Sequence, residues 1–160
     1  MTKLQKMFQL NLPSYPFRVK QDEKSYFILD NFRKKYVKLT PEEWVRQHFL
    51  EFFVQDKGFP RALIAVEKQL RINGMNKRCD AIFHNIQGIP TIILEFKSPN
   101  IALTQAVFDQ VAVYNAKLKV DYFIVSNGLT HHFCRVNTEN AQYEFFSEIP
   151  SFSAFQQIKF

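Results

Sequence analysis

The chain has 160 residues and a formal net charge of +6, and 46% of its residues are hydrophobic, including 18 Phe. This length predicts a single domain whose core needs no disulfide or metal for support, and the basic balance permits a polyanionic partner without proving one. No apolar run approaches the roughly 18 residues that span a membrane, and the apolar part of the first ten residues is too short for a secretory signal. Cys79 and Cys134 have neither the spacing of a disulfide framework nor that of a metal site, so we expect reduced thiols, a cytoplasmic location and no membrane partner.

The first part of the chain, residues 1–39, is predicted to form short strands and turns. The candidate strands cover residues 17–20, 25–29 and 36–39. Three consecutive basic residues at positions 33–35 follow the second candidate strand. They are either a solvated face or a contact to nucleic-acid phosphates, and both interpretations stay open at this point.

A helix is predicted to begin at Thr40, a good N-cap, with Pro41 at the first helical position and Glu43 completing a capping box. It should run to about residue 55. Its buried stripe comprises Val45, Phe49, Phe52 and Phe53. At about 100° per residue, Glu42 falls at the edge of this stripe and faces the sheet, whereas Glu43 points away. Glu42 either favours the helix N-terminus only or serves a functional site.

The central stretch, residues 77–97, is predicted to be a β-hairpin because apolar and β-branched residues flank a glycine-containing turn. If residues 87–88 are the centre of the turn, Asp80 lies directly opposite Glu95. Directly opposed residues project to the same face, with Cβ atoms roughly 5 Å apart. Lys97 shares that face because it lies two residues beyond Glu95. The hairpin therefore brings two carboxylates and an ammonium together.

This group of charges predicts a chemistry. Two carboxylates so close repel each other unless a proton or a cation lies between them, and a divalent metal is the natural partner. A neighbouring lysine could orient or deprotonate a water, or stabilise developing phosphate charge. The combination suits metal-assisted hydrolysis of a phosphodiester. On the strand expected before the hairpin, over residues 62–72, we expect Glu67 to face solvent rather than to approach this site.

A second amphipathic helix, over residues 104–118, is predicted to place Gln110 and Tyr114 on one face, because they are four residues apart. Three further strands are expected over residues 121–126, 130–136 and 142–146, the last at an edge. The helix is long enough to be a crossover, so the strands before and after it should be parallel. His131 and His132 should point to opposite faces of their strand and are not expected to share a metal.

The order of these elements predicts an α/β fold with a mixed central β-sheet flanked by helices. The ordered set Glu42, Asp80, Glu95-x-Lys97 and Gln110-x-x-x-Tyr114 resembles the PD-(D/E)XK nuclease superfamily. More narrowly, the chain is similar to the N-terminal nuclease domain of type I restriction enzyme R subunits, over roughly residues 33–136. Cys79 stands where the name of the superfamily has Pro, and the helicase motor of those subunits is missing. The resemblance implies a restriction-endonuclease-like fold.

The resemblance also implies roles for single residues. Asp80 and Glu95 would be metal ligands for Mg²⁺ or Mn²⁺, and Glu42 would bind the metal directly or through water. Lys97 would position or activate the attacking water. The pair formed by Gln110 and Tyr114 would support the site or touch the DNA backbone. The implied activity is that of a Mg²⁺-dependent DNA endonuclease, and the alternative is an inactive nucleic-acid-binding or interaction module on the same fold.

On this basis we expect one domain, residues 1–160, with a strand-rich extension (1–32), a nuclease-like core (33–136) and a C-terminal edge segment (137–160). DNA is the expected partner, together with either a homodimer or an association with other restriction subunits. The C-terminal aromatic residues could form a dimer surface, although use in the core is favoured. These residues are Phe145, Phe146, Phe152 and Phe155.

Overall fold

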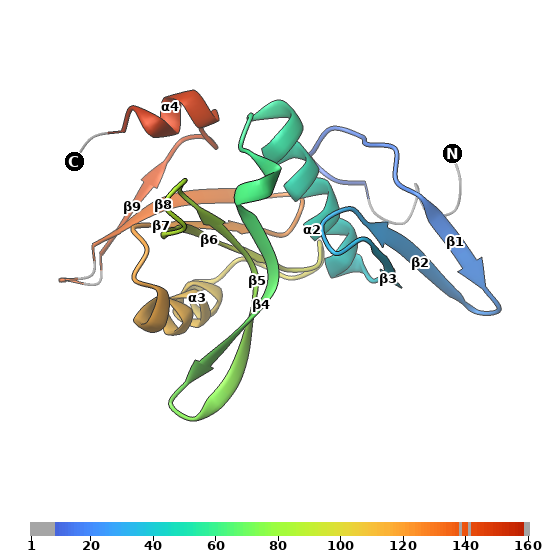
Figure 1. Cartoon of the computed structure of the whole chain (residues 1–160), viewed down its shortest axis with the longest axis horizontal. Coiled ribbons are helices and arrows are strands. Elements are labelled where there is room, and N and C mark those ends of the chain that lie inside the picture. Colours follow the sequence, from blue (N-terminus) through green and yellow to red (C-terminus); the bar gives the residue numbers. More distant parts are fainter. Residues whose placement is uncertain (1–8, 138, 141, 159–160) are drawn as a thin grey trace.

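The structure, a computed structural model, describes residues 9–137, 139–140 and 142–158. Within them, two separate sheets form, and α-helices pack around the larger sheet (Figure 1). The small antiparallel sheet comes first and consists of β1 (Val19–Asp22), β2 (Ser25–Asp30) and β3 (Lys35–Lys38). The three strands lie close to the predicted ranges, and the sheet continues past residue 32 to Lys38.

The larger sheet has six strands, arranged in the order in which they occur in the chain. They are β4 (Ile64–Ile72), β5 (Met75–His84), β6 (Pro90–Phe96), β7 (Tyr122–Ser126), β8 (His131–Asn137) and β9 (Gln142–Phe146). Neighbouring strands are antiparallel except β6 and β7, which are parallel and are joined by helix α3 (Gln105–Leu118). The predicted mixed sheet, its parallel pair and the edge position of the last strand are confirmed.

Helix α2 (Pro41–Glu51) begins as the sequence predicted, because Thr40 Oγ1 accepts a hydrogen bond from the backbone N–H of Glu43 (3.1 Å). The capping-box role of the Glu43 carboxylate is wrong. That carboxylate accepts hydrogen bonds from Arg33 (3.2 Å) and Gln47 (2.9 Å) instead. The helical segment ends with a π-helical turn, Phe52–Asp56, close to the predicted end at residue 55.

Each face of the larger sheet carries its own apolar core. On one face, α2 packs through Val45, Phe49 and Phe53 against β5, β6 and β7. On the other face, α3 packs through Val107 and Val111, which are also buried as predicted. Burying each such side chain contributes about 1.5–3 kcal/mol, so the aromatic core is the main source of stability. The edges of this sandwich, where helix ends meet strand ends, remain open for a site.

The C-terminal segment completes the first of these cores. Helix α4 (Phe152–Gln156) packs Phe152 and Phe155 against Phe59, with ring centroids 5.3 and 5.7 Å apart. Phe145, in contrast, has 54% of its surface exposed. The favoured expectation, that most of these aromatics belong to the core, therefore agrees with the structure. No helix within the described residues combines the length and apolar character needed to cross a membrane.

Candidate active site

The hairpin of β5 and β6 places Asp80 beside Glu95. The paired residues at this end of the ladder are Ala81 and Leu94, so the next two residues, Asp80 and Glu95, lie opposite each other. The turn itself differs from the expected one, because His84 pairs with Pro90 and the register then shifts by one residue. This β-bulge compensates for the earlier turn, and the predicted pairing of the two acids results.

The two carboxyl groups form a tightly coupled acidic pair. Asp80 Oδ2 accepts a hydrogen bond from the backbone N–H of Phe96 (2.8 Å), and Glu95 has only 4% of its surface exposed. Burial, followed by the negative charge of Glu42, raises the pKa of Asp80 to about 6. Burial and the adjacent Asp80 raise the pKa of Glu95 well above its ordinary value. Without a cation, the pair therefore favours a state in which one proton lies between the two groups.

A cleft of about 460 Å³ opens beside Asp80, where the N-terminus of α2 meets the end of β6, and neither Glu95 nor Lys97 lines it. Its lining includes Thr40, Pro41, Glu42, Glu43, Arg46, Glu67, Asp80, Ser98 and Asn100. Partial burial raises the pKa of Glu42, and the charges of Glu67 and Glu43 add to this rise. Glu42 thus lines the cleft, as the helical spacing predicted, but the expectation that Glu43 points away is wrong, because Glu43 lines it too.

The positive charge of Lys97 acts on two of the carboxylates, Glu42 and Glu95. Its backbone N–H donates to the carbonyl oxygen of Ser126 (2.9 Å), which continues the pairing of β6 with β7 beyond the strand end. Burial raises the pKa of both Glu42 and Glu95, and the positive charge of Lys97 opposes that rise in both. The half-buried ammonium is therefore close enough to interact with either carboxylate.

Gln110 and Tyr114 approach the same acids from helix α3. Gln110 Nε2 donates to Tyr114 Oη (3.2 Å), as their spacing of four residues predicted. Burial and the charge of Glu95 raise the pKa of Tyr114 to about 12, so this phenol is neutral at physiological pH. Because Tyr114 has only 4% of its surface exposed, its position suits support of Glu95 better than contact with a DNA backbone.

The expectation that Glu67 faces solvent is wrong. Glu67 lines the cleft, and its carboxylate forms ion pairs with Arg78 (3.0 Å) and Arg46 (3.8 Å). Its backbone has a φ of 53°, in the left-handed region, and the pairing of β4 with β5 is interrupted at this residue, between Val66 and Lys68. The pairs on either side of it keep one register, so Glu67 lies across from Asp80 and projects to the same face of the sheet. The only sequence signal was the imperfect alternation of residues 62–72.

Arg46 is the other cleft residue that sequence reasoning missed. It has 2% of its surface exposed, and its guanidinium contacts Glu43 and lies 3.4 Å from Asp30 Oδ2. Hydrogen bonds and ion pairs with these acids offset the cost of burying its charge. The buried positive charge lies at the edge of a cleft that is otherwise acidic.

The oxygen donors of this site fit a hard divalent cation in chemical type. Glu95 Oε2 is buried and has no hydrogen-bond partner among the described residues, so a cation could satisfy it. Within the same residues, no group of three or more His, Cys, Asp or Glu side chains is arranged to hold a metal ion. The fit is therefore that of a two-carboxylate site, with Glu42 and Glu67 further out in the cleft.

The histidines do not contribute to this site. His131 Nδ1 lies 2.6 Å from Ser126 Oγ, and its ring packs near Phe49 on the α2 side of the sheet. His132 instead contacts Phe108 of α3, so the two neighbours point to opposite faces as predicted. Ser126 is fully buried, so the Ser–His pair has no access to a substrate.

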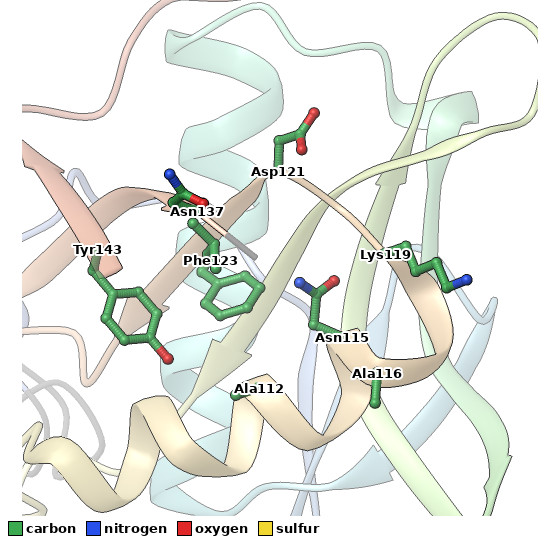
Figure 2. A pocket seen from close by; sticks show the side chains of 9 residues that line it. Ala112, Asn115, Ala116, Lys119, Asp121, Phe123, Asn137 and Tyr143 are labelled. Atoms are coloured by element: carbon green, nitrogen blue, oxygen red, sulfur yellow. The ribbon is translucent and has the colours of Figure 1, made fainter. Parts of the chain in front are cut away.

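A second cavity, of about 450 Å³, lies at the C-terminal end of α3 (Figure 2). Phe123 and Tyr143 form part of its wall, and Lys119 and Asp121 lie at its rim (Figure 2). The amide of Asn115 bonds both backbone groups of Val120 and thus closes the helix end. None of the residues that line the acidic cleft lines this cavity, so the candidate chemistry belongs to the cleft alone.

The mixed sheet and its flanking helices have the restriction-endonuclease-like fold. The profile of the family described as "Type I restriction enzyme R protein N terminus (HSDR_N)" matches residues 41–150. The chain therefore belongs to this family.

Two solved structures resemble the chain. A candidate HsdR subunit of a type I restriction enzyme from Vibrio vulnificus YJ016 superposes with a TM-score of 0.53 at 17% identity, covering 71% of this chain. This chain spans 24% of the length of that protein, and the likeness concerns the fold. A candidate nuclease of the DUF820 group from Anabaena variabilis ATCC 29413 has a TM-score of 0.47 at 12% identity, covering 76% of this chain and 81% of its own. No curated protein matches the chain.

Proposed function

We propose that this chain is a metal-dependent DNA endonuclease module of the restriction type, which hydrolyses phosphodiester bonds with Mg²⁺ or Mn²⁺. The observation that carries the proposal is the buried pair of Asp80 and Glu95 on neighbouring strands at the edge of a cleft, with the positive charge of Lys97 acting on Glu95. A purely structural role would leave unexplained why two carboxyl groups that repel each other are buried together.

Asp80 and Glu95 would supply the oxygen ligands of the metal. When bound, the divalent ion would polarise a phosphodiester oxygen and acidify a water. Glu42 would act through a water, because it is not part of any three-residue ligand group among the described residues. Glu67, fixed by Arg78, would keep the acidic wall of the cleft in place.

Lys97 would hold the attacking water or donate to a non-bridging phosphate oxygen, because its ammonium lies near both Glu42 and Glu95. Tyr114 would shield Glu95 from bulk water, and Gln110 would fix the orientation of the phenol. Shielding strengthens the electrostatic interactions of the carboxylates, because the local dielectric is lower.

The natural partners of such a module would be DNA and the other subunits of a restriction system, and its place of action would be the cytoplasm. A homodimer stays a prediction, since Phe145 is the only one of the four C-terminal aromatics left largely exposed in the described residues. Sedimentation at several concentrations tests this prediction.

Cleavage of supercoiled plasmid in Mg²⁺ or Mn²⁺, with EDTA as the blank, tests the proposed function. We expect nicking by the wild type, and a loss of at least about 100-fold in Asp80→Asn and in Lys97→Met, because each removes a group that acts on the reacting atoms. Asp109→Asn and Lys117→Met, which alter exposed residues of α3, are the matched controls and should cleave as the wild type does.

Cleavage that persists at the wild-type rate in both site variants would come from a contaminant and would refute the proposal. The alternative, an inactive nucleic-acid-binding module, predicts salt-sensitive DNA binding without cleavage and without metal uptake in calorimetry. The same protein preparations therefore decide between the two functions.

A further inference from the structure

The net charge of the chain is concentrated at one end. Residues 1–38 contain nine Lys or Arg and three Asp or Glu, whereas residues 39–160 contain twelve of each. The formal charge of +6 therefore belongs to the first 38 residues, and the remainder is neutral. The family profile begins at residue 41, so the basic segment lies outside the part that defines the family. A charge so localised indicates a surface with a polyanionic partner.

The small sheet arranges part of this charge on one face. Lys20 lies opposite Phe27, and Phe27 lies opposite Lys38, so the two lysines project to the same side from the two outer strands. The ring of Tyr36 lies on that side too, with Lys20 Nζ 4.2 Å from its centroid. With strands spaced about 4.8 Å apart, the lysine backbones are separated by about 10 Å.

Arg18 extends this surface by one further row. Its carbonyl oxygen accepts from the backbone N–H of Leu29 (2.9 Å), and Leu29 lies opposite Tyr36. We call the surface formed by Arg18, Lys20, Tyr36 and Lys38 the basic face. The opposite side of the sheet is the buried one, where Ile28 and Asp30 are fully inaccessible.

One acid, Asp22, shares this face, because it lies two residues beyond Lys20 on β1. Arg18, Lys20, Lys24, Lys34, Lys35 and Lys38 are all exposed. Among the residues that the structure describes, none of the six takes part in an ion pair. The buried acid of the sheet, Asp30, is instead bound by Arg33 and Arg46. Of the basic residues at positions 33–35, Arg33 is bound to Asp30, so the interpretation as a phosphate contact applies to the exposed Lys34 and Lys35.

The basic face is continuous with the acidic cleft along the chain. Strand β3 ends at Lys38, and Thr40, two residues later, caps α2 and lines the cleft. Figure 1 shows the small sheet extending outward beside α2, on the side away from α3 and α4. A phosphate chain held by the sheet would thus lead toward a cleft whose charged lining residues, apart from Arg46, are all acidic and would repel phosphates in the absence of a metal ion.

We propose that the basic face binds the phosphate backbone of DNA and supplies the electrostatic affinity that the neutral core lacks. This inference rests on the proposed function for the identity of the polyanion, because the adjacent cleft carries groups suited to phosphodiesters. Lysines and an arginine at these spacings act as phosphate contacts without base recognition. The face therefore confers affinity and position, and sequence preference would come from elsewhere.

Salt-dependent binding of a short fluorescent DNA duplex, measured in EDTA to prevent metal-dependent cleavage, tests this inference. The test variant is Arg18→Gln/Lys20→Gln/Lys38→Gln. The matched control, Lys68→Gln/Arg71→Gln/Lys117→Gln, removes three exposed cations of β4 and α3, outside the small sheet, and lowers the net charge by the same amount. If each residue of the basic face contacts one phosphate, the slope of log affinity against log salt should become shallower by about 2 to 3 in the test variant. The control should keep the wild-type slope.

Equal slopes for the two triple variants, or a wild type whose DNA affinity does not depend on salt, would refute the proposal that the basic face binds DNA. Thermal unfolding of each variant verifies that the sheet remains folded, and a single variant, Lys38→Gln, keeps the test decisive if the triple variant does not fold. Its slope should change by about 1. Plasmid cleavage by the wild type is scored separately. If the test variant has a shallower slope but the wild type does not cleave plasmid, the role of the basic face is supported and the nuclease proposal is refuted. If the wild type cleaves plasmid but the two triple variants have equal slopes, the nuclease proposal is supported and the role of the basic face is refuted.

Discussion

Replacing Asp80 by Asn should stabilise the metal-free protein at neutral pH, although Asp80 belongs to the candidate site. Burial, with the charge of Glu42, raises the pKa of Asp80 from 3.8 to about 6, so its ionised form is unfavourable in the folded state. An Asn at this position keeps an oxygen that can accept from the N–H of Phe96, and its amide can donate to Glu95. The substitution removes a repulsive charge without leaving a polar group unpaired.

The magnitude follows from proton linkage. The folded protein binds the Asp80 proton more tightly than the unfolded chain, so the free energy of unfolding falls as the pH rises from about 4 to about 6. Below this window both states are protonated and the cost is absent, and above it the cost is complete. A pKa rise from 3.8 to about 6 sets an upper limit of about 3 kcal/mol on that cost.

Urea unfolding in EDTA at pH 4 and pH 8 measures this effect. We expect Asp80→Asn to exceed the wild type by about 2 to 3 kcal/mol at pH 8 and to equal it at pH 4. Asp109→Asn, which alters an exposed acid that accepts from Gln105, should leave stability unchanged at both values. Added Mg²⁺ should then stabilise the wild type and leave Asp80→Asn unaffected. A variant less stable than the wild type at pH 8 in EDTA would refute the conclusion that ionised Asp80 is unfavourable in the folded protein.

Two further predictions concern the scaffold. Burial tends to raise the pKa of Glu51, but the hydrogen bonds from Arg61 outweigh it and hold the pKa below its usual range. The ion pair therefore stabilises the fold above about pH 4.5, and that contribution is lost as the pH falls through the folded pKa. Glu51→Gln should cost about 2 kcal/mol in urea unfolding at pH 7, and this cost should shrink as the pH is lowered below about 4.5. Gly128→Ala should lower the melting temperature, because Gly128 has a φ of +84° and an added Cβ would lie 2.6 Å from Leu10 Cδ2; an unchanged melting temperature would contradict this packing.

The register of the central hairpin was predictable although its turn was not. The pairing of Asp80 with Glu95 followed from a turn centred on residues 87–88. In the structure Asn85 Oδ1 accepts from the N–H groups of Gln87 (3.0 Å) and Ile89 (2.9 Å), and this moves the turn toward the N-terminus. A bulge in the ladder then restores the register. Local propensity indicates that a turn exists, but side-chain bonds of this kind decide its type.

The second wall of the cleft could not be predicted, because it depends on contacts between distant segments. Glu67 was expected to face solvent, since strand alternation alone leaves one side of β4 open. Its place across from Asp80 follows from the register of β4 with β5, whereas its ion pairs depend on Arg46 and Arg78, which come from a helix and another strand. No periodicity in a single sequence encodes such a pair of partners. The residues that short motifs identified were those fixed by one hairpin or one helix turn.

The same ion pairs explain how a basic sheet and an acidic cleft could act together. Asp30 at the end of β2 is fully buried and binds Arg46 of α2, which in turn contacts Glu43 and approaches Glu67 at the cleft. Buried pairs of this kind contribute little net stability, yet removing one partner leaves an uncompensated charge, so alternative arrangements are strongly disfavoured. The network therefore fixes the orientation of the small sheet relative to α2 and β4. A phosphate chain bound by the basic face would then enter the cleft at a defined place relative to Asp80, which a flexibly attached basic tail could not achieve.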